Sequence, residues 1–411
     1  MNFKKNKTKG ALETKGTELG LKENWQQFIL LLIVNAFVGG MVGLERTILP
    51  ALAEKEFLIV ATSVVLSFII VFGVVKAITN YFTGVLANKV GRKNLLIIGW
   101  VIAIPIPFIL MYAQHWNWII VANVLLGVNQ GLTWSSTVVM KIDLVGEKQR
   151  GLAMGLNESF GYFSIAIVAF TTGWIASEYG LRPYPFYQGV GFVILGLIIS
   201  VFFIKDTAKH VHVETQSTSI KPLKNIFWET TWKNNNLGSI SQAGFVNNLN
   251  DGMIWGVLPI ILLNRGFDLK NSAIIVAIYP AVWGIGQLVT GKMSDIYNKK
   301  KMLFLGMVLQ GFALLFMFWA TTYFQFVLLA SLLGAGTAIV YPTFLSAIAS
   351  FTNPNQRAES IGAFRLWRDL GYAFGALLTI LIAQFFAVDI TIMVIGILTV
   401  LSAIIIKIRM S

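Results

Sequence analysis

The sequence predicts an all-α integral membrane protein with twelve transmembrane helices in two six-helix bundles. Of its 411 residues, 56% are hydrophobic and only 12% are charged, whereas soluble proteins carry about 25% charged residues. The apolar residues form long continuous stretches, which argues against a transmembrane β-barrel with its short alternating strands. Because each crossing takes about 20 residues, a chain of this length accommodates about twelve helices and their loops.

Twelve apolar stretches follow one another, each long enough to cross a bilayer as a helix. The first six lie at residues 26–53, 60–86, 95–113, 117–140, 151–176 and 186–204. The other six lie at residues 238–263, 273–291, 303–320, 324–350, 360–386 and 389–406. A polar interruption, with a short amphipathic piece around Ile226–Trp232, separates the two sets. We therefore expect a polar tail at 1–24, bundles at 25–205 and 237–411, and a linker at 206–236.

The distribution of Lys and Arg predicts the orientation of these helices. Of the 32 Lys and Arg residues, 24 lie in the tail and in alternate loops, a set that includes Lys141 and Arg150. The opposite loops hold four, at Lys55, Arg182, Arg265 and Lys270. By the positive-inside rule, both termini and the linker are cytoplasmic, which requires an even number of spans. The sequence thus predicts a multi-pass protein of the cytoplasmic membrane.

Composition excludes several kinds of partner and cofactor. The chain has no cysteine, so disulfides and thiolate metal sites are excluded. His210 and His212 have no further ligand nearby, and we expect no metal and no cofactor. The net charge of +13 lies on loops, which favours contact with anionic lipid over nucleic acid. Gly286–Lys292 imitates a phosphate-binding loop, but Met293 replaces the magnesium-binding Ser or Thr, so we expect no ATP.

The two halves repeat each other at a constant offset of 207 residues. Gly84–Lys93, with the sequence GVLANKVGRK, corresponds to Gly291–Lys300, with the sequence GKMSDIYNKK. Further pairs at this offset are Arg150 with Arg357 and Asn80 with Gln287. Equal offsets in two loops with two helices between them indicate a duplication whose copies share one orientation in the membrane.

These features resemble the major facilitator superfamily (MFS). The pattern Gly-x-x-x-Asp/Asn-x-x-Gly-Arg-Lys between spans two and three, its copy between spans eight and nine, and the six-plus-six layout are similar to that family over nearly the whole chain. The resemblance implies alternating access, in which two bundles rock about a central site for a small-molecule substrate. It also implies a conformational role for the loop motif, carried by Gly84, Asn88, Gly91, Arg92, Lys93, Gly291, Asp295, Lys299 and Lys300.

Three positions depart from the pattern of that family. Asn88 stands where the family usually has Asp, which puts its charge contact to a neighbouring helix terminus in question, whereas Asp295 keeps the acid. Gly127 takes the place of an Arg found in many proton-coupled members. Span five, Gly161–Trp174, lacks the Gly-Pro pair of many drug/proton antiporters. The last two absences weaken the interpretation as a multidrug exporter without removing it.

Eight ionisable residues inside the predicted spans are the strongest functional signal. Each would cost about 2.5–3.5 kcal/mol facing lipid at the centre of a helix, and the combined cost exceeds the roughly 5–15 kcal/mol of net stability of a fold. We therefore expect them to face a water-filled cavity between the bundles. They lie on spans one, two, five, seven and eleven, at Glu45, Arg46, Lys76, Glu158, Asp251, Arg365, Arg368 and Asp369.

The intramembrane residues divide into candidates for two roles. Proton coupling needs a buried carboxylate that titrates in the working pH range, and the candidates are Glu45, Glu158, Asp251 and Asp369, with Glu158 and Asp251 favoured. The candidate cavity and substrate residues are Arg46, Lys76, Asn80, Asn129, Gln130, Trp134, Asn247, Trp255, Gln287, Tyr341, Arg365, Arg368 and Tyr372.

The sequence leaves the partners of these charges open. Arg365 and Asp369 are spaced i, i+4 and would neutralise each other within one helix, and Lys76 would pair with Glu45 or Glu158. A further hypothesis is a gate pair between the halves. Glu158 lies opposite Arg368 when the two Gly-Tyr pairs that follow them are aligned, whereas the 207 offset sets it opposite Arg365.

The prediction for function is a monomeric secondary transporter, proton-coupled, with export of a small amphipathic compound favoured. Uptake of a polar metabolite by symport or uniport is the alternative. A membrane-embedded enzyme would need clustered His, Asp or Ser motifs near one interface, and the three histidines do not supply them. We therefore assign no catalytic residue and no metal ligand.

Overall fold

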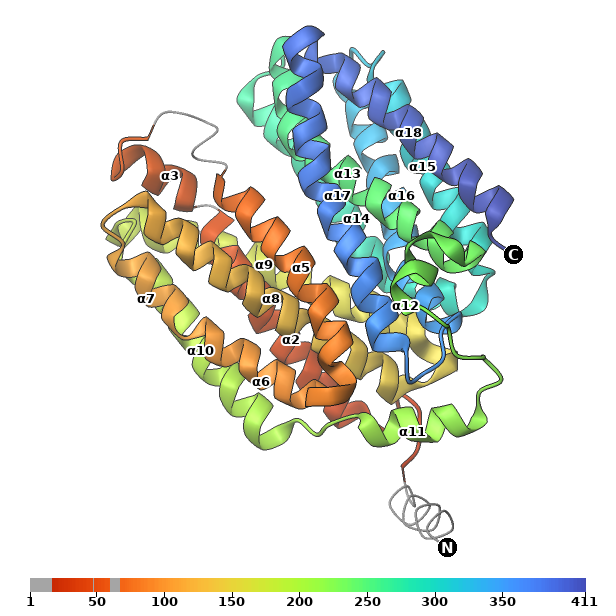
Figure 1. Ribbon diagram of the computed structural model, residues 1–411. Coiled ribbons are helices and arrows are strands. Elements are labelled where there is room, and N and C mark those ends of the chain that lie inside the picture. The colour runs from red at the N-terminus through yellow and green to blue at the C-terminus, as the bar shows by residue number, and fades with distance from the viewer. Residues whose placement is uncertain (1–16, 47, 60–66) are drawn as a thin grey trace, which may run out of the picture.

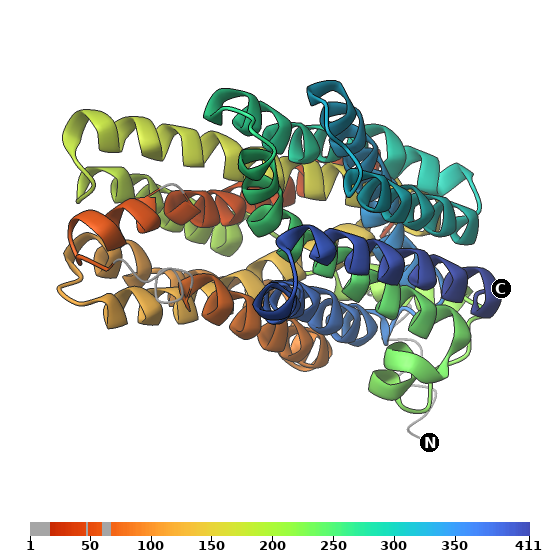
Figure 2. The same ribbon diagram turned by 90° about the horizontal axis from the view of Figure 1, so that it is seen from above.

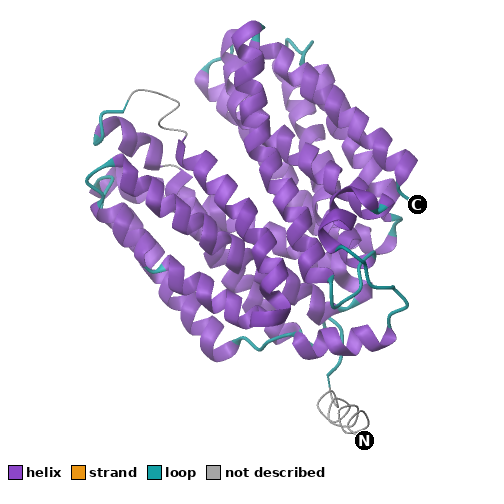
Figure 3. Ribbon diagram, in the orientation of Figure 1, coloured by secondary structure: helices purple, strands orange, loops and turns teal. Residues whose placement is uncertain are grey.

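The computed structural model describes residues 17–46, 48–59 and 67–411, and every regular element in these ranges is a helix (Figure 3). Eleven helices of this part of the chain are long and apolar enough to span a membrane. The twelfth, α8 (Trp116–Val145), has 30 residues and many polar side chains, nearly all of them buried. It tolerates them because they face other helices instead of lipid. The predicted all-α membrane fold is confirmed.

The N-terminal half begins near the chain terminus and ends before the linker. It comprises α2 (Trp25–Arg46), α3 (Ile48–Lys55), α5 (Ser67–Val90), α6 (Arg92–Ala103), α7 (Pro105–Tyr112), α8, η1 (Glu147–Gln149), α9 (Arg150–Tyr179), η2 (Tyr184–Phe186), α10 (Tyr187–Ile198) and η3 (Ile199–Phe203). Pro105 lacks a backbone N–H and fits the first position of a helix, so the third span is split between α6 and α7.

The linker and the C-terminal half complete the described chain. The linker contains α11 (Ala208–Ser217), α12 (Ile226–Trp228) and η4 (Glu229–Lys233). The C-terminal half comprises α13 (Asn235–Asn264), α14 (Leu269–Ile296), α15 (Lys299–Met317), α16 (Tyr323–Ser350), α17 (Arg357–Phe385) and α18 (Val388–Arg409). The predicted piece at Ile226–Trp232 corresponds to α12 and η4, whereas α11 was not predicted.

One predicted boundary is wrong in a way that matters below. The fourth span was predicted to end at residue 140, with Lys141 among the loop cations, but α8 continues to Val145. Lys141 is therefore a helical residue with 0% exposure, and its ammonium group donates to the Leu31 carbonyl at 3.3 Å.

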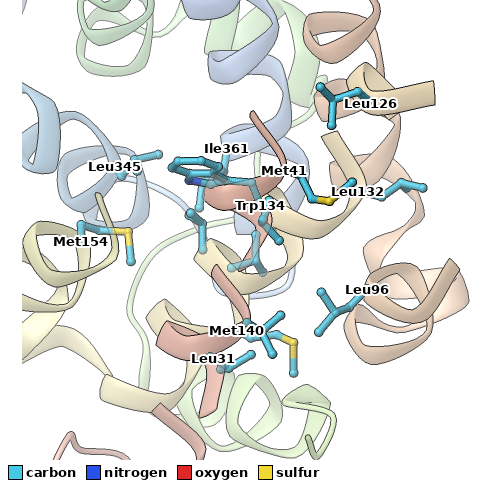
Figure 4. Close-up of a cluster of buried hydrophobic side chains, with 14 of the residues drawn as sticks. Leu31, Met41, Leu96, Leu126, Leu132, Trp134, Met140, Met154, Leu345 and Ile361 are labelled. Atoms are coloured by element: carbon cyan, nitrogen blue, oxygen red, sulfur yellow. The ribbon is translucent and has the colours of Figure 1, made fainter. Parts of the chain in front are cut away.

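The two halves lie side by side (Figure 2) and meet chiefly through two helix pairs, α5 with α17 and α9 with α14, with further contacts of α9 with α16 and α8 with α17. They come together at the end of the molecule that carries α11, and their ribbons diverge toward the other end (Figure 1). We call the end with α11 the linker face and the other end the opposite face. One cluster of buried apolar side chains continues across the halves (Figure 4); its members include Leu31, Met41, Leu96, Trp134, Met140, Met154, Leu345 and Ile361.

Glycines hold both helix pairs in close contact near the linker face. Gly84 of α5 packs on Gly362 of α17, and a Cβ atom added to Gly84 would lie 3.0 Å from the Gly362 Cα. Gly291 of α14 packs on Gly155 of α9, where an added Cβ would lie 2.8 Å from the Gly155 Cα. Small residues allow helix backbones to approach this closely. The two contacts are equivalent under the 207-residue repeat.

Candidate functional site

A chain of hydrogen bonds joins the two halves between α5, α8 and α17. Asp369 forms an ion pair with Arg368 at 2.7 Å and accepts a 2.6 Å hydrogen bond from Asn80. Asn80 in turn accepts a hydrogen bond from Ser135 at 2.6 Å, and Ser135 accepts one from Arg365 at 2.8 Å. All five side chains are buried. Because this central network starts and ends in the C-terminal half but passes through two helices of the N-terminal half, separating the halves must break it.

Two predicted charge pairs are wrong for this conformation. Asp369 pairs with Arg368, its neighbour in the chain, and not with Arg365. Glu158 accepts hydrogen bonds from the Asn157 amide at 2.7 Å and from the Trp134 indole at 3.4 Å. Among the residues described, no ion pair joins Glu158 to either arginine. The long arginine side chain bends toward the adjacent carboxylate, which helical spacing alone does not anticipate.

Lys76 borders the same region without the predicted carboxylate partner. Its ammonium group lies 5.3 Å from the ring centroid of Trp134 and 5.5 Å from that of Phe72, within the range of cation–π attraction. The side chain is only partly buried. In the described ranges, neither Glu45 nor Glu158 forms an ion pair with it. Aromatic faces therefore make its direct contacts, and the Asp369 carboxylate attracts it without forming an ion pair.

Aromatic side chains of both halves form a continuous cluster beside the network. Tyr162 of α9 contacts Tyr341 of α16, with the hydroxyl oxygens 3.0 Å apart. Trp283 of α14 lies against both rings, at centroid distances of 4.5 and 5.0 Å. Trp134 of α8 approaches Tyr162 at 5.8 Å, and the Arg368 guanidinium lies 5.2 Å from the Tyr341 centroid. This central aromatic cluster gives the halves a shared apolar surface with a cation at its edge.

Asp251 lies at the edge of this cluster in the C-terminal half. Tyr279 of α14 donates a hydrogen bond to the Asp251 carboxylate, and both side chains are buried. The Tyr279 ring stacks on Trp283 at 5.9 Å and approaches Trp255 at 6.3 Å. Asp251 is therefore a buried carboxylate whose hydrogen-bond donor is a neutral phenol and not a cation.

Three predicted site residues form hydrogen bonds inside one half only. Asn129 donates to the Gly99 carbonyl at 2.9 Å, and Gln130 donates to the Val38 carbonyl at 2.7 Å, both inside the N-terminal half. Asn247 donates to the side chain of its neighbour Asn248 at 3.2 Å. None of these three amides therefore bridges the two halves in this conformation.

The remaining predicted residues are dispersed. Gln287 is buried next to the α9–α14 contact, and neither polar atom of its side chain has a hydrogen-bond partner among the described residues. Trp255 is 42% exposed and Tyr372 is partly buried. Glu45 borders a small cavity within the N-terminal half. The side chain of Arg46 lies outside the described residues.

Space beside the central network is small in this conformation. A cavity of about 10 Å³ is lined by residues that include Asn80, Ser135, Gly84 and Gly362, and this volume holds about one water molecule. The predicted convergence of buried polar groups between the halves is present. They contact one another here, and the cavity beside them holds about one water molecule in place of the water-filled cavity that we expected.

The two copies of the loop motif contact the opposite half in different ways. The Asp295 carboxylate accepts hydrogen bonds from the backbone N–H groups of Gly151 and Leu152 at 2.6 and 2.9 Å, at the N-terminus of α9. Asn88 donates a 2.5 Å hydrogen bond to the Asn355 carbonyl, just before α17. The contact between an acid and a helix terminus that the resemblance implied is therefore present at Asp295.

A buried charge cluster closes the linker face. Arg150 and Arg357 both form ion pairs with Glu214 of α11, the latter at 2.6 Å. Asp143 of α8 lies 3.6 Å from Arg357 and 3.4 Å from Arg92. Burial alone would raise the pKa of the Glu214 carboxyl, but the hydrogen bonds and charges of Arg357 and Arg150 outweigh burial and hold that pKa below its usual range.

Sequence reasoning missed most of the neutral members of the site. Ser135, Tyr162, Tyr279 and Trp283 were not singled out, because serine and aromatic residues are common inside membrane helices. The repeat contained a usable signal. The 207 offset pairs Trp134 with Tyr341, Lys76 with Trp283 and Tyr162 with Asp369, and all six of these residues lie in or beside the site.

One known protein family matches both halves of this chain. The sequence model described as Major Facilitator Superfamily matches residues 28–244 and again residues 240–410. Multidrug resistance protein MdtG of Salmonella typhimurium is 24% identical over 375 residues, which cover 86% of this chain and 88% of that protein. MdtG of Escherichia coli K12 is also 24% identical, with coverage of 86% and 87%.

Solved structures share the fold at low identity. FucP, described as an MFS transporter in the outward conformation, matches with a TM-score of 0.75 and 14% identity over 93% of this chain and 98% of its own. The human organic anion transporter MFSD10 matches with a TM-score of 0.74 and 14% identity, over 92% and 99% of the two chains. Both matches extend over the two bundles.

Proposed function

Because the chain belongs to the Major Facilitator Superfamily and is therefore a membrane transporter, we propose that it exports small amphipathic compounds in exchange for protons by alternating access. The observation that carries the proposal is the central aromatic cluster. Tyr162 belongs to one half, Trp283 and Tyr341 belong to the other, and buried carboxylates lie at the edges of the cluster. Aromatic faces attract apolar rings of many shapes, because offset stacking requires no specific hydrogen-bond pattern.

Asp251 and Glu158 are the proposed proton carriers. Both are buried, and the groups that donate hydrogen bonds to them are neutral: a phenol for Asp251, an amide and an indole for Glu158. Asp369, by contrast, forms an ion pair with Arg368. A proton taken up from outside would neutralise a carrier carboxylate, and its release to the cytoplasm would restore the charge for the next cycle. Glu45 borders a cavity lined by residues of the N-terminal half alone, and we assign it no carrier role.

The direction of transport rests on the relatives and on the predicted orientation. The MdtG proteins are named for multidrug resistance, which fits export. The positive-inside rule predicts a cytoplasmic linker face, and the bacterial MdtG relatives support a location in the cytoplasmic membrane. Under this assignment the observed conformation is closed toward the cytoplasm.

Proteoliposome flux measurements test the proposal. We expect aromatic amphipathic compounds to accumulate against their gradient when protons flow in the opposite direction. Asp251→Asn is expected to abolish this accumulation while leaving substrate counterflow intact, and Glu178→Gln, which alters an exposed acid at the end of α9, serves as the matched control. Flux independent of the pH gradient would indicate uniport, and accumulation along the proton flow would indicate uptake by symport.

The role of the aromatic cluster has its own test. Trp283→Ala and Tyr341→Ala each remove one stacking face, and the loss of about 0.5–1.5 kcal/mol per aromatic contact predicts a rise in KM of about 2- to 12-fold for ring-containing substrates. Phe312→Ala, which removes a ring that is 46% exposed on α15, is the control. Unchanged KM values in both cluster variants would contradict the assignment of this surface to substrate.

A further inference from the structure

The first part of the linker is attached to the N-terminal half. Asp206 accepts a hydrogen bond from the Lys93 backbone N–H at 3.0 Å, and Thr207 donates to Asp143 at 2.8 Å. In α11, the His210 ring lies 3.1 Å from the Asn24 side-chain oxygen. The linker thus leaves the N-terminal half through three specific polar contacts.

The following part of the linker is attached to the C-terminal half. The Asn353 side chain donates to the Ile220 carbonyl at 2.9 Å. Gln356 forms two hydrogen bonds with the backbone of Leu223, at 2.7 and 3.0 Å. Residues 206–223 therefore run across the linker face as a strap with one end on each half (Figure 1).

Glu214 lies between the two sets of contacts and binds one arginine from each half. Arg150 begins α9 and Arg357 begins α17, and the two are equivalent under the 207-residue repeat. Their side chains are buried and both contact the Glu214 carboxylate. Two guanidinium groups brought this close repel each other in a poorly solvated site, and removing the shared carboxylate leaves buried charge uncompensated.

We propose that α11 is a clasp for the linker face and that Glu214 is the positioning residue that sets how often this face opens. Opening must separate Arg150 from Arg357, so Glu214 must release one of them. The inference rests on the alternating-access part of the proposed function but is independent of substrate, proton coupling and direction. Asp143 lies 3.6 Å from Arg357 and forms an ion pair with it, whereas the described residues show no ion pair of Asp143 with Arg150.

The absence of cysteine from the chain allows a direct measurement of opening. Spin labels on Lys89→Cys and Asn355→Cys, exposed residues of opposite halves, report the linker face, and labels on Gln114→Cys and Thr321→Cys report the opposite face. Distances are measured by double electron–electron resonance on the full chain in nanodiscs, without substrate or pH gradient. Failure of the transport proposal therefore leaves this measurement unaffected.

We expect Glu214→Gln to raise the ratio of open to closed linker face at least tenfold and to shorten the distance across the opposite face. Glu229→Gln, which alters another linker acid, should leave both distributions unchanged. Arg150→Gln added to Glu214→Gln removes the repulsion and should return the distribution at least halfway to that of the parent chain, because Arg357 keeps Asp143. A parent-like distribution in Glu214→Gln, or no rescue in the double variant, would overturn the proposal.

Discussion

The two repeat-related contacts at the linker face share their packing but differ in their electrostatics. In one, Gly291 packs on Gly155 and the Asp295 carboxylate binds the N-terminus of α9. In the other, Gly84 packs on Gly362 while Asn88 donates to a backbone carbonyl. An anion at a helix N-terminus is stabilising because it meets free N–H groups and the positive end of the helix dipole. An amide that donates to a carbonyl gains only a neutral hydrogen bond.

The two copies of the repeat share the glycine packing of their helices but not the charged contact of the loop motif. Close backbone approach is required on both sides, since neither helix pair can meet with a side chain between them. At the loop motif the charged contact is present on one side only, because the Asp295 carboxylate binds a helix N-terminus whereas the Asn88 amide binds a backbone carbonyl. The linker face is thus held closed by the same glycine packing on both sides, but by a charged loop contact on only one side.

Substitution of a packing glycine should have the largest effect. In Gly84→Val the new side chain would meet the Ala358 carbonyl oxygen, 2.4 Å from an added Cβ. Overpacking of this kind costs about 1–3 kcal/mol, which corresponds to a shift of about 5- to 150-fold toward an open linker face. Gly73→Val on the same helix, where no atom lies within 4 Å of the added Cβ, is the control. If Gly84→Val and Gly73→Val gave equal linker-face distance distributions, glycine packing would not be what holds this face closed.

Removal of the two loop side chains should have a smaller and unequal effect. Asp295→Ala loses two charge-assisted hydrogen bonds at a helix N-terminus, worth about 1 kcal/mol, and should open the linker face about fivefold. Asn88→Ala loses one exposed neutral hydrogen bond, worth about 0.5 kcal/mol, and should open it by about a factor of two. The distances across the linker face and the opposite face are measured again by double electron–electron resonance. If Asn88→Ala opened the linker face as much as Asp295→Ala or more, the inference that the Asp295 contact is the stronger of the two would be wrong.

Much of the fold could be predicted because membrane insertion constrains sequence strongly. Each span must be apolar and about 20 residues long, and the constant repeat offset alone links Gly84 to Gly291 and Arg150 to Arg357. Helix α8 shows the limit of this reasoning. Its last turn carries Lys141 and Asp143, which read as a loop by polarity, yet the helix continues because both side chains are buried among other helices.

The partners in the site could not be predicted, because they depend on tertiary contacts. Arg365 and Asp369 have ideal spacing within α17, but Asp369 pairs with Arg368 and Arg365 bonds to Ser135 of another helix. Glu214 is the extreme case. Its partners Arg150 and Arg357 lie 64 and 143 residues away in the chain, and no local pattern marks its short helix as different from the rest of a polar linker.

Acid should protonate Glu214 and so weaken an ion-pair interaction that the α9 side and the α17 side of the linker face share. The loop contacts of Asp295 and Asn88, which differ between the two sides, would then remain. Glu214 binds the first residue of both α9 and α17, and its pKa in the closed state is lowered, because Arg357 and Arg150 outweigh its burial. A carboxylate with a lowered pKa contributes its full stabilisation above the ordinary Glu pKa of about 4.3 and loses it as pH falls through the lowered value. The change in linker-face distance that depends on Glu214 should therefore be absent between pH 7 and about pH 5 and appear below about pH 4. The other acids of this face, Asp143 and Asp295, are present in both the parent chain and the variant, so comparison of the two isolates the contribution of Glu214. The Glu214→Gln variant should show no such step.

His210, on the same helix, is a second group that could respond to pH, and burial lowers its pKa. His210→Gln is therefore the control. A transition that moves in this variant would assign the pH response to His210 and not to Glu214.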